Sequence, residues 1–155
     1  GNWDREEVKD VLEEKGFSLH GRGRILDGTG FFGVGGSSPT PIPTATVYSE
    51  EEIARILKTG YEQVRQASRL VLISHAPPRS VRDRSFIGLR GGSHSVKAFL
   101  EAHPVGLCLC GHIHEAHGIE RFQNTLVVNT GSFKKGRYAI IELGANPAVT
   151  PGKLG

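Results

Sequence analysis

Two short apolar runs that each end in histidine constrain the fold of this sequence more than any other feature. Residues 70–73 (LVLI) are followed by Ser-His, and residues 105–110 (VGLCLC) by Gly-His-Ile-His. Runs with this character are buried on both faces, which is typical of central strands in a mainly parallel sheet. Because ligands bind beyond the carboxyl ends of such strands, we expect His75, His112 and His114 to meet at one edge of the sheet.

The rest of the pattern alternates between helices and strands, which predicts an α/β protein. Apolar spacing and capping residues predict helices over residues 4–15, 49–67 and 93–103. Short strands are expected between residues 17 and 34, before a proline-rich loop over residues 35–46. Alternating segments 118–122, 125–129 and 137–143 are expected to form a second sheet. We assign residues 1–144 to one domain and residues 145–155 to a frayed Pro/Gly-rich tail.

Composition excludes some classes of protein. With 37% hydrophobic residues and no apolar run near the ~20 residues that span a bilayer, the chain is not expected to be a membrane protein. The net charge is +3, but no Lys/Arg run marks a nucleic-acid interface, so that partner is disfavoured without being excluded. Cys108 and Cys110 would face the same side of a strand, too far apart for a relaxed disulfide. We therefore expect reduced thiols and a cytoplasmic protein.

The histidines predict a metal site more strongly together than singly. A lone histidine at a strand end is usually just a polar boundary residue. Gly-His-X-His after one buried strand, with His75 after another, instead suggests converging neutral imidazoles, the commonest ligands for transition metals in proteins. Gly111 is expected to free the bend that lets both His112 and His114 face the site.

Three motifs carry a resemblance to a known family. The chain has GNWD at residues 1–4, SH at residues 74–75 and GHIH at residues 111–114, in that order. These resemble the last three ordered motifs of the calcineurin-like metallophosphoesterases: Gly-Asn-His-Asp/Glu, Gly- or Ser-His, and Gly-His-X-His. The likeness to a prokaryotic branch of small phosphoesterases also covers residues 32–36, 75–78, 110–115 and 128–132.

The resemblance implies a fold and an activity. The fold would be a calcineurin-like αββα sandwich of two mixed sheets flanked by helices, with the N-terminal strands absent. Asn2, His75 and His112 would bind one ion of a binuclear site and His114 the other, the metals being manganese, iron, zinc or cobalt. The reaction would be hydrolysis of a phosphate mono- or diester through a metal-bound hydroxide.

Two departures from the family pattern affect this expectation. The family's Asp-X-His and Gly-Asp motifs, which supply the other ligands and the bridging carboxylate, should precede Gly1, and the chain contains no methionine. We expect a missing N-terminal segment to supply those ligands, and the isolated chain to bind metal weakly. Trp3 stands where many relatives have a histidine that protonates the leaving group, which favours activated esters or anhydrides as substrates.

Three further residues have open roles. Trp3 is expected either to contact substrate or to form an apolar lid against the proline-rich loop. Asp4 is expected to cap the first helix or, as in the family, to orient its neighbour. Arg79 and the charged residues after it would bind the non-reacting part of a phosphorylated substrate or form a solvated loop.

Two rival functions stay open. One is a non-catalytic binding or scaffold module on the same fold, favoured by the missing motifs and by Trp3. The other is a mononuclear zinc hydrolase that uses His75, His112 and His114 as three ligands.

Overall fold

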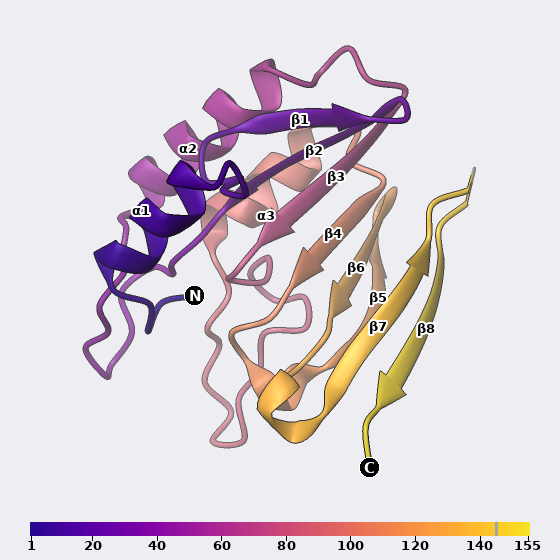
Figure 1. Cartoon of the computed structure of the whole chain (residues 1–155). Helices are drawn as coiled ribbons and strands as arrows, with labels where there is room; N and C mark the ends of the chain where they lie inside the picture. Colours follow the sequence, from indigo (N-terminus) through magenta and orange to yellow (C-terminus); the bar gives the residue numbers. More distant parts are fainter. Residues whose placement is uncertain (145) are drawn as a thin grey trace.

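A six-stranded mixed sheet organises the molecule. The computed structural model describes residues 1–144 and 146–155. The sheet order is β1-β2-β3-β4-β6-β5, with β2, β3, β4 and β6 parallel and the outer strands β1 and β5 antiparallel to their neighbours (Figure 1). The strands are β1 (Gly23–Leu26), β2 (Thr29–Val34), β3 (Arg69–Ser74), β4 (Leu107–Cys110), β5 (Gly118–Phe122) and β6 (Thr125–Asn129).

Two helices bury one face of this sheet. Helix α2 (Glu50–Glu62) starts at a Ser49/Glu52 capping box, and α3 (His94–Ala102) starts where Ser93 Oγ accepts a hydrogen bond from Val96 N, as the sequence predicts. Ile53 and Leu57 of α2 pack with Phe99 of α3 over the sheet residues that point the same way, Leu72 among them. Residues 63–67, predicted to extend α2, form turns instead.

The opposite face is partly covered by a two-stranded antiparallel sheet of β7 (Arg137–Glu142) and β8 (Ala148–Lys153). Its partly buried residues Ile141 and Val149 pack on Val71, Leu107 and Val128 of the large sheet. This arrangement confirms the mixed α/β fold, with a second layer smaller than expected.

Two predictions for the C-terminal part of the chain are wrong. Segments 118–122 and 125–129 are β5 and β6 of the large sheet, because β6 pairs with β4 in register from Leu126 to Asn129. Residues 148–153 are not frayed but form β8, which pairs with β7 along its whole length. Ala145, where the predicted tail begins, lies outside the described residues.

The first helix, α1 (Glu6–Glu14), lies at the N-terminal end of the chain (Figure 1). None of its residues is buried, and the apolar Val8, Val11 and Leu12 are exposed. The helices formed by residues 1–144 and 146–155 all lack the length and apolar character needed to cross a membrane. Two short 3₁₀ helices, η1 (His114–Ala116) and η2 (Phe133–Lys135), complete the fold.

Candidate metal site at the carboxyl edge of the sheet

Two of the predicted histidines face each other at the sheet edge. His75 directly follows β3, and His112 follows β4 after one residue. Since β3 and β4 are neighbouring parallel strands, both histidines leave the sheet at the same edge. Their ring centroids are 5.1 Å apart with the ring planes inclined at 62°. The Gly111 N–H donates to the His75 carbonyl at 3.1 Å, which ties the two strand ends together.

Asn2 and His114 lie near this pair. Asn2 is buried, and its Oδ1 lies 2.9 Å from His75 Nε2. Its carbonyl accepts a 2.9 Å hydrogen bond from Thr46 N of the proline-rich loop, which fixes the segment. His114 begins η1 and lines a groove of about 640 Å³ together with His75 and His112. All four predicted metal ligands therefore lie at this edge.

Both facing histidines are held neutral. Burial lowers the pKa of His75 to about 3, and the neighbouring His112 acts in the same direction. Burial also lowers the pKa of His112, with a further contribution from His114. A neutral imidazole has a free ring-nitrogen lone pair, so both residues are in the form that binds metal ions.

The donor set fits one divalent transition metal ion better than two. One amide oxygen and two neutral imidazoles are suitable ligands for such an ion. Within residues 1–144 and 146–155, however, no group of three or more His, Cys, Asp or Glu side chains is arranged to hold a metal. For a second ion, only His114 remains among the four.

The bend that presents His112 differs from the expectation. His112 itself has a left-handed backbone with φ of 61°, whereas Gly111 is not among the residues with positive φ. A Cβ added at Gly111 would meet nothing within 4 Å. The conformational strain is therefore carried by the histidine, and the explanation based on Gly111 is wrong.

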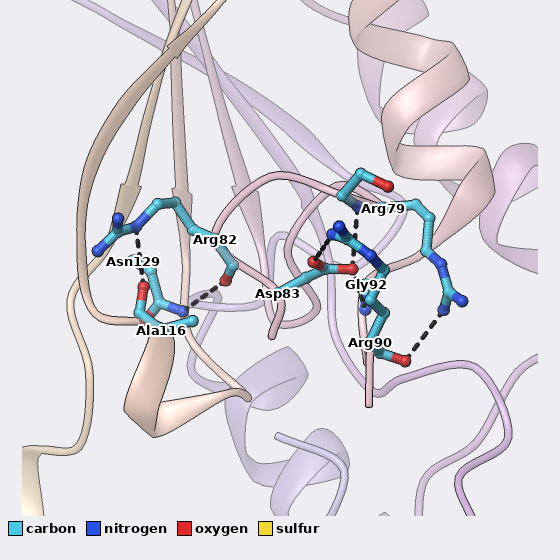
Figure 2. Close-up of polar contacts among 8 residues, drawn as sticks. Arg79, Arg82, Asp83, Arg90, Gly92, Ala116 and Asn129 are labelled. Carbon is cyan, nitrogen blue, oxygen red and sulfur yellow. Dashed lines mark hydrogen bonds and ion pairs between the residues drawn. The ribbon is translucent and has the colours of Figure 1, made fainter. Parts of the chain in front are cut away.

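Trp3, Asp4 and Arg79 do not line the groove that contains the histidines. Trp3 is 68% exposed, so it is not a lid packed against the proline-rich loop. Asp4 pairs with the amino group of Gly1, and the N-cap residue of α1 is Arg5, with no side-chain cap hydrogen bond, so Asp4 does not cap the helix. Arg79 lies outside the groove and donates to the Arg90 carbonyl at 3.0 Å (Figure 2).

The residues that support the site leave only a weak signal in the sequence. Asp83 is expected in a substrate-binding or solvated loop but is 1% exposed and pairs with Arg90 at 2.8 Å. Asn129, for which the pattern indicates either a turn residue or a support for site backbone, is also 1% exposed. Its contacts come from segments far away in the sequence, which no local pattern reveals.

Comparison with known proteins places this geometry in a family. The model of the metallophosphoesterases of the calcineurin superfamily matches residues 19–154. The chain is 34% identical over 137 residues to the "uncharacterized protein MJ1162" of Methanocaldococcus jannaschii, covering 83% of this chain and 60% of that protein. It thus spans less than two thirds of the length of that relative.

Solved structures share the fold at lower identity. One crystal structure matches 97% of this chain and 60% of its own, with a TM-score of 0.75 and 23% identity. The crystal structure of TT1561 of Thermus thermophilus matches 96% of this chain and 64% of its own, with a TM-score of 0.66 and 20% identity. Given the family match over most of its length, the chain belongs to the calcineurin superfamily of metallophosphoesterases.

Proposed function

We propose that this chain is the C-terminal portion of a metallophosphoesterase domain that hydrolyses a phosphate mono- or diester at a binuclear metal site. The observation that carries the proposal is the meeting of His75, His112 and Asn2 at the carboxyl edge of the sheet. Family membership alone indicates metal-dependent phosphoester chemistry, and the cluster supports the proposal that this chemistry takes place at the sheet edge.

Each proposed ligand has a defined part. Asn2, His75 and His112 hold one ion, and His114 contributes to the other. Manganese, iron, zinc and cobalt all suit imidazole and oxygen donors. When bound, a pair of such ions supplies a hydroxide nucleophile near neutral pH and offsets the charge on the phosphoryl oxygens.

The remaining ligands are proposed to come from a segment outside residues 1–155. This part of the proposal is supported by the incomplete donor set and by the chain's 60% coverage of its relative. The groove floor gives further support, since Ile73 of the central strand β3 is 39% exposed there. A covering segment would bury this apolar surface.

Trp3 and Arg79 are proposed to act on the substrate. An indole donates one hydrogen bond but supplies no proton, so esters with good leaving groups should react best. Arg79 is proposed to bind the non-reacting part of the substrate, for which its guanidinium must leave the Arg90 carbonyl. Asp4 is proposed to orient Trp3. Cytoplasmic localisation, favoured by the two free buried cysteines, is part of the same proposal.

Metal content and turnover test the proposal together. We would measure metal per chain by elemental analysis and hydrolysis of bis-p-nitrophenyl phosphate, for this chain and for a longer form extended upstream. The proposal expects two ions and turnover in the longer form, both lost in His112→Ala but retained in His94→Ala, a histidine at the start of α3 away from the groove. Neither metal nor turnover in the longer form would refute it.

The stoichiometry also separates the rival functions. A scaffold module, favoured by the absence of a grouped metal-binding cluster in the described part of the chain, predicts no bound ion. A mononuclear zinc hydrolase that uses the three histidines predicts one ion. An alkyl monoester cleaved as fast as its aryl counterpart would contradict the role proposed for Trp3.

A further inference from the structure

A buried asparagine contacts the backbone on both sides of His112. Asn129 is the last residue of β6, and its Nδ2 lies 3.1 Å from the Gly111 carbonyl oxygen and 3.0 Å from that of Ile113. The same nitrogen lies 3.2 Å from the carbonyl oxygen of Arg82 (Figure 2). The amide has two hydrogens for three acceptors, so one hydrogen is shared. The residues before and after His112 are thus held by one side chain.

The other atom of the amide fixes its orientation. Asn129 Oδ1 accepts a 3.0 Å hydrogen bond from Gly131 N, which leaves Nδ2 to face the three carbonyls. This local bond accounts for the turn that the sequence suggests. The Nδ2 contacts instead reach positions 16, 18 and 47 residues away, which a turn does not require.

Arg82 holds the same segment from another side. Its Nε donates to the Ala116 carbonyl at 2.9 Å (Figure 2). Its Nη2 donates to the His117 carbonyl. Gly118 leaves the space for this guanidinium, because an added Cβ there would overlap Arg82 Nη2. Segment 111–117, which carries both His112 and His114, is therefore fixed by contacts at each end.

Asp83 anchors the loop from which Arg82 extends. Its buried carboxylate accepts hydrogen bonds from Ser80 N at 2.9 Å and Gly92 N at 3.3 Å, and it pairs with Arg90 at 2.8 Å. Buried charges that are paired and hydrogen-bonded keep a loop in one conformation, since breaking the set leaves a carboxylate unsatisfied. The contacts of Asp83 thus fix the position of the loop that carries Arg82.

We propose that Asn129 and Arg82 are positioning residues for the metal site: they hold the backbone of segment 111–117 so that His112 keeps its left-handed conformation and presents its ring beside His75. This inference rests on the proposed function, because it assigns these contacts to metal binding. A left-handed histidine is strained and persists only where its surroundings impose it. The contacts on Gly111 and Ile113 impose it here.

The test compares two buried side chains of one strand. Asn129→Leu keeps the size of the side chain but removes all of its hydrogen bonds. Thr125→Val is the matched control, because Thr125 is equally buried in β6 and donates a 2.7 Å hydrogen bond to the Val105 carbonyl, at the other end of the strand from the site. Arg82→Met provides a second variant if Asn129→Leu does not fold.

Three quantities are measured on the 155-residue chain. Co²⁺ titration followed by its visible absorption gives affinity and coordination geometry, urea unfolding gives stability, and hydrogen exchange of the metal-free chain reports on segment 111–117. We expect Asn129→Leu and Arg82→Met to weaken Co²⁺ binding about 10- to 100-fold and to alter the absorption, as residues that orient metal ligands do. We expect Thr125→Val to lose stability while its Co²⁺ binding stays as in the wild type.

Hydrogen exchange separates this inference from the proposed function. If the wild type binds no Co²⁺, the proposed metal site of this chain fails. The exchange data then test by themselves whether Asn129 positions segment 111–117. Faster exchange of Ile113 and Ala116 amides in Asn129→Leu than in Thr125→Val supports positioning. Equal exchange in the two variants, or equal Co²⁺ affinities when the wild type binds, would overturn it.

Discussion

His112 combines a predicted ligand role with an unfavourable backbone. Its φ of 61° is rare for a residue with a Cβ, and glycine adopts it without cost. A strained residue at a site suggests that the side chain, and not the backbone, is needed there. The motif identifies the histidine in the sequence but does not reveal the strain, which depends on contacts made by distant residues.

We predict that glycine relieves the strain at position 112. His112→Gly should be more stable than His112→Ala by about 1 kcal/mol, because alanine keeps the Cβ that disfavours the left-handed conformation. Urea unfolding of the two variants measures the difference. Both should lose metal binding equally. An alanine variant as stable as the glycine variant would show that the backbone at 112 is not strained.

Two glycines of the site region should respond differently to substitution. A Cβ at Gly33 of β2 would overlap the carbonyl oxygen of Ile73 in the neighbouring strand, while Gly111 faces open space. We therefore expect Gly33→Ala to cost about 1–3 kcal/mol of unfolding free energy through overpacking. Gly111→Ala should change it by less than about 0.5 kcal/mol. Thermal or urea unfolding checks both, and a costly Gly111→Ala would restore the role first expected for that glycine.

At the scale of elements, one carboxylate joins the starts of two helices. Glu50 in the first turn of α2 accepts hydrogen bonds from Ser93 Oγ at 2.6 Å, His94 N at 3.2 Å and Ser95 N at 2.8 Å at the start of α3. Burial alone would raise the pKa of Glu50, but these hydrogen bonds outweigh it and lower the pKa below its ordinary value of 4.5. The carboxylate is also favourable beside the positive end of α3.

This contact predicts a pH dependence of stability. The unfolded chain binds a proton at Glu50 more readily than the folded chain, so the free energy of unfolding should fall as the pH drops below about 4.5. Because solvent partly screens this carboxylate, Glu50→Gln should lose only about 0.5 kcal/mol at pH 7 and show a shallower fall in acid. Glu51→Gln, at a neighbouring exposed position, is the control and should behave like the wild type in urea titrations at each pH. Parallel acid profiles for wild type and Glu50→Gln would contradict the assignment.

The sequence predicts the helices and strands better than it predicts which strands pair with one another. The capping box at Ser49 and the buried strands before His75 and His112 follow from local chemistry, and each is present as expected. The hairpin of β5 and β6 is predicted in the wrong sheet, because alternation shows that a strand has two unlike faces but not which strand lies beside it. β6 pairs with β4 because its apolar face packs into the main core, and this tertiary contact cannot be seen in the local pattern.

The chain has two hydrophobic cores of unequal size, one on each face of the large sheet. The main core lies between the large sheet and helices α2 and α3, and its members include the fully buried Phe32, Leu57 and Leu72. The β7–β8 sheet rests on three buried residues of the opposite face and is tied to it by Arg69, which donates to the Leu143 carbonyl at 2.8 Å. The contact between the β7–β8 sheet and the large sheet is the smaller of the two, so we expect it to open first.

We therefore predict that β7 and β8 open while the large sheet stays folded. In native-state hydrogen exchange, amides of β7 and β8 should exchange through a lower opening free energy than amides of β3 and β4. Ile141→Ala should speed exchange in β7 and β8 only, whereas Leu72→Ala should speed exchange in every strand, since it costs about 2–5 kcal/mol in the main core.

Opening of the β7–β8 sheet should affect only part of the site region. His75 and His112 follow β3 and β4, so opening of the small sheet should leave their separation unchanged, while Thr130 and Phe133, which line the groove just before β7, become free to move. Co²⁺ affinity should accordingly be unchanged in Ile141→Ala. Weakened Co²⁺ binding in that variant, or equal opening free energies for β7 and β3, would mean that the two layers unfold as one unit and that the small sheet helps to hold the metal site.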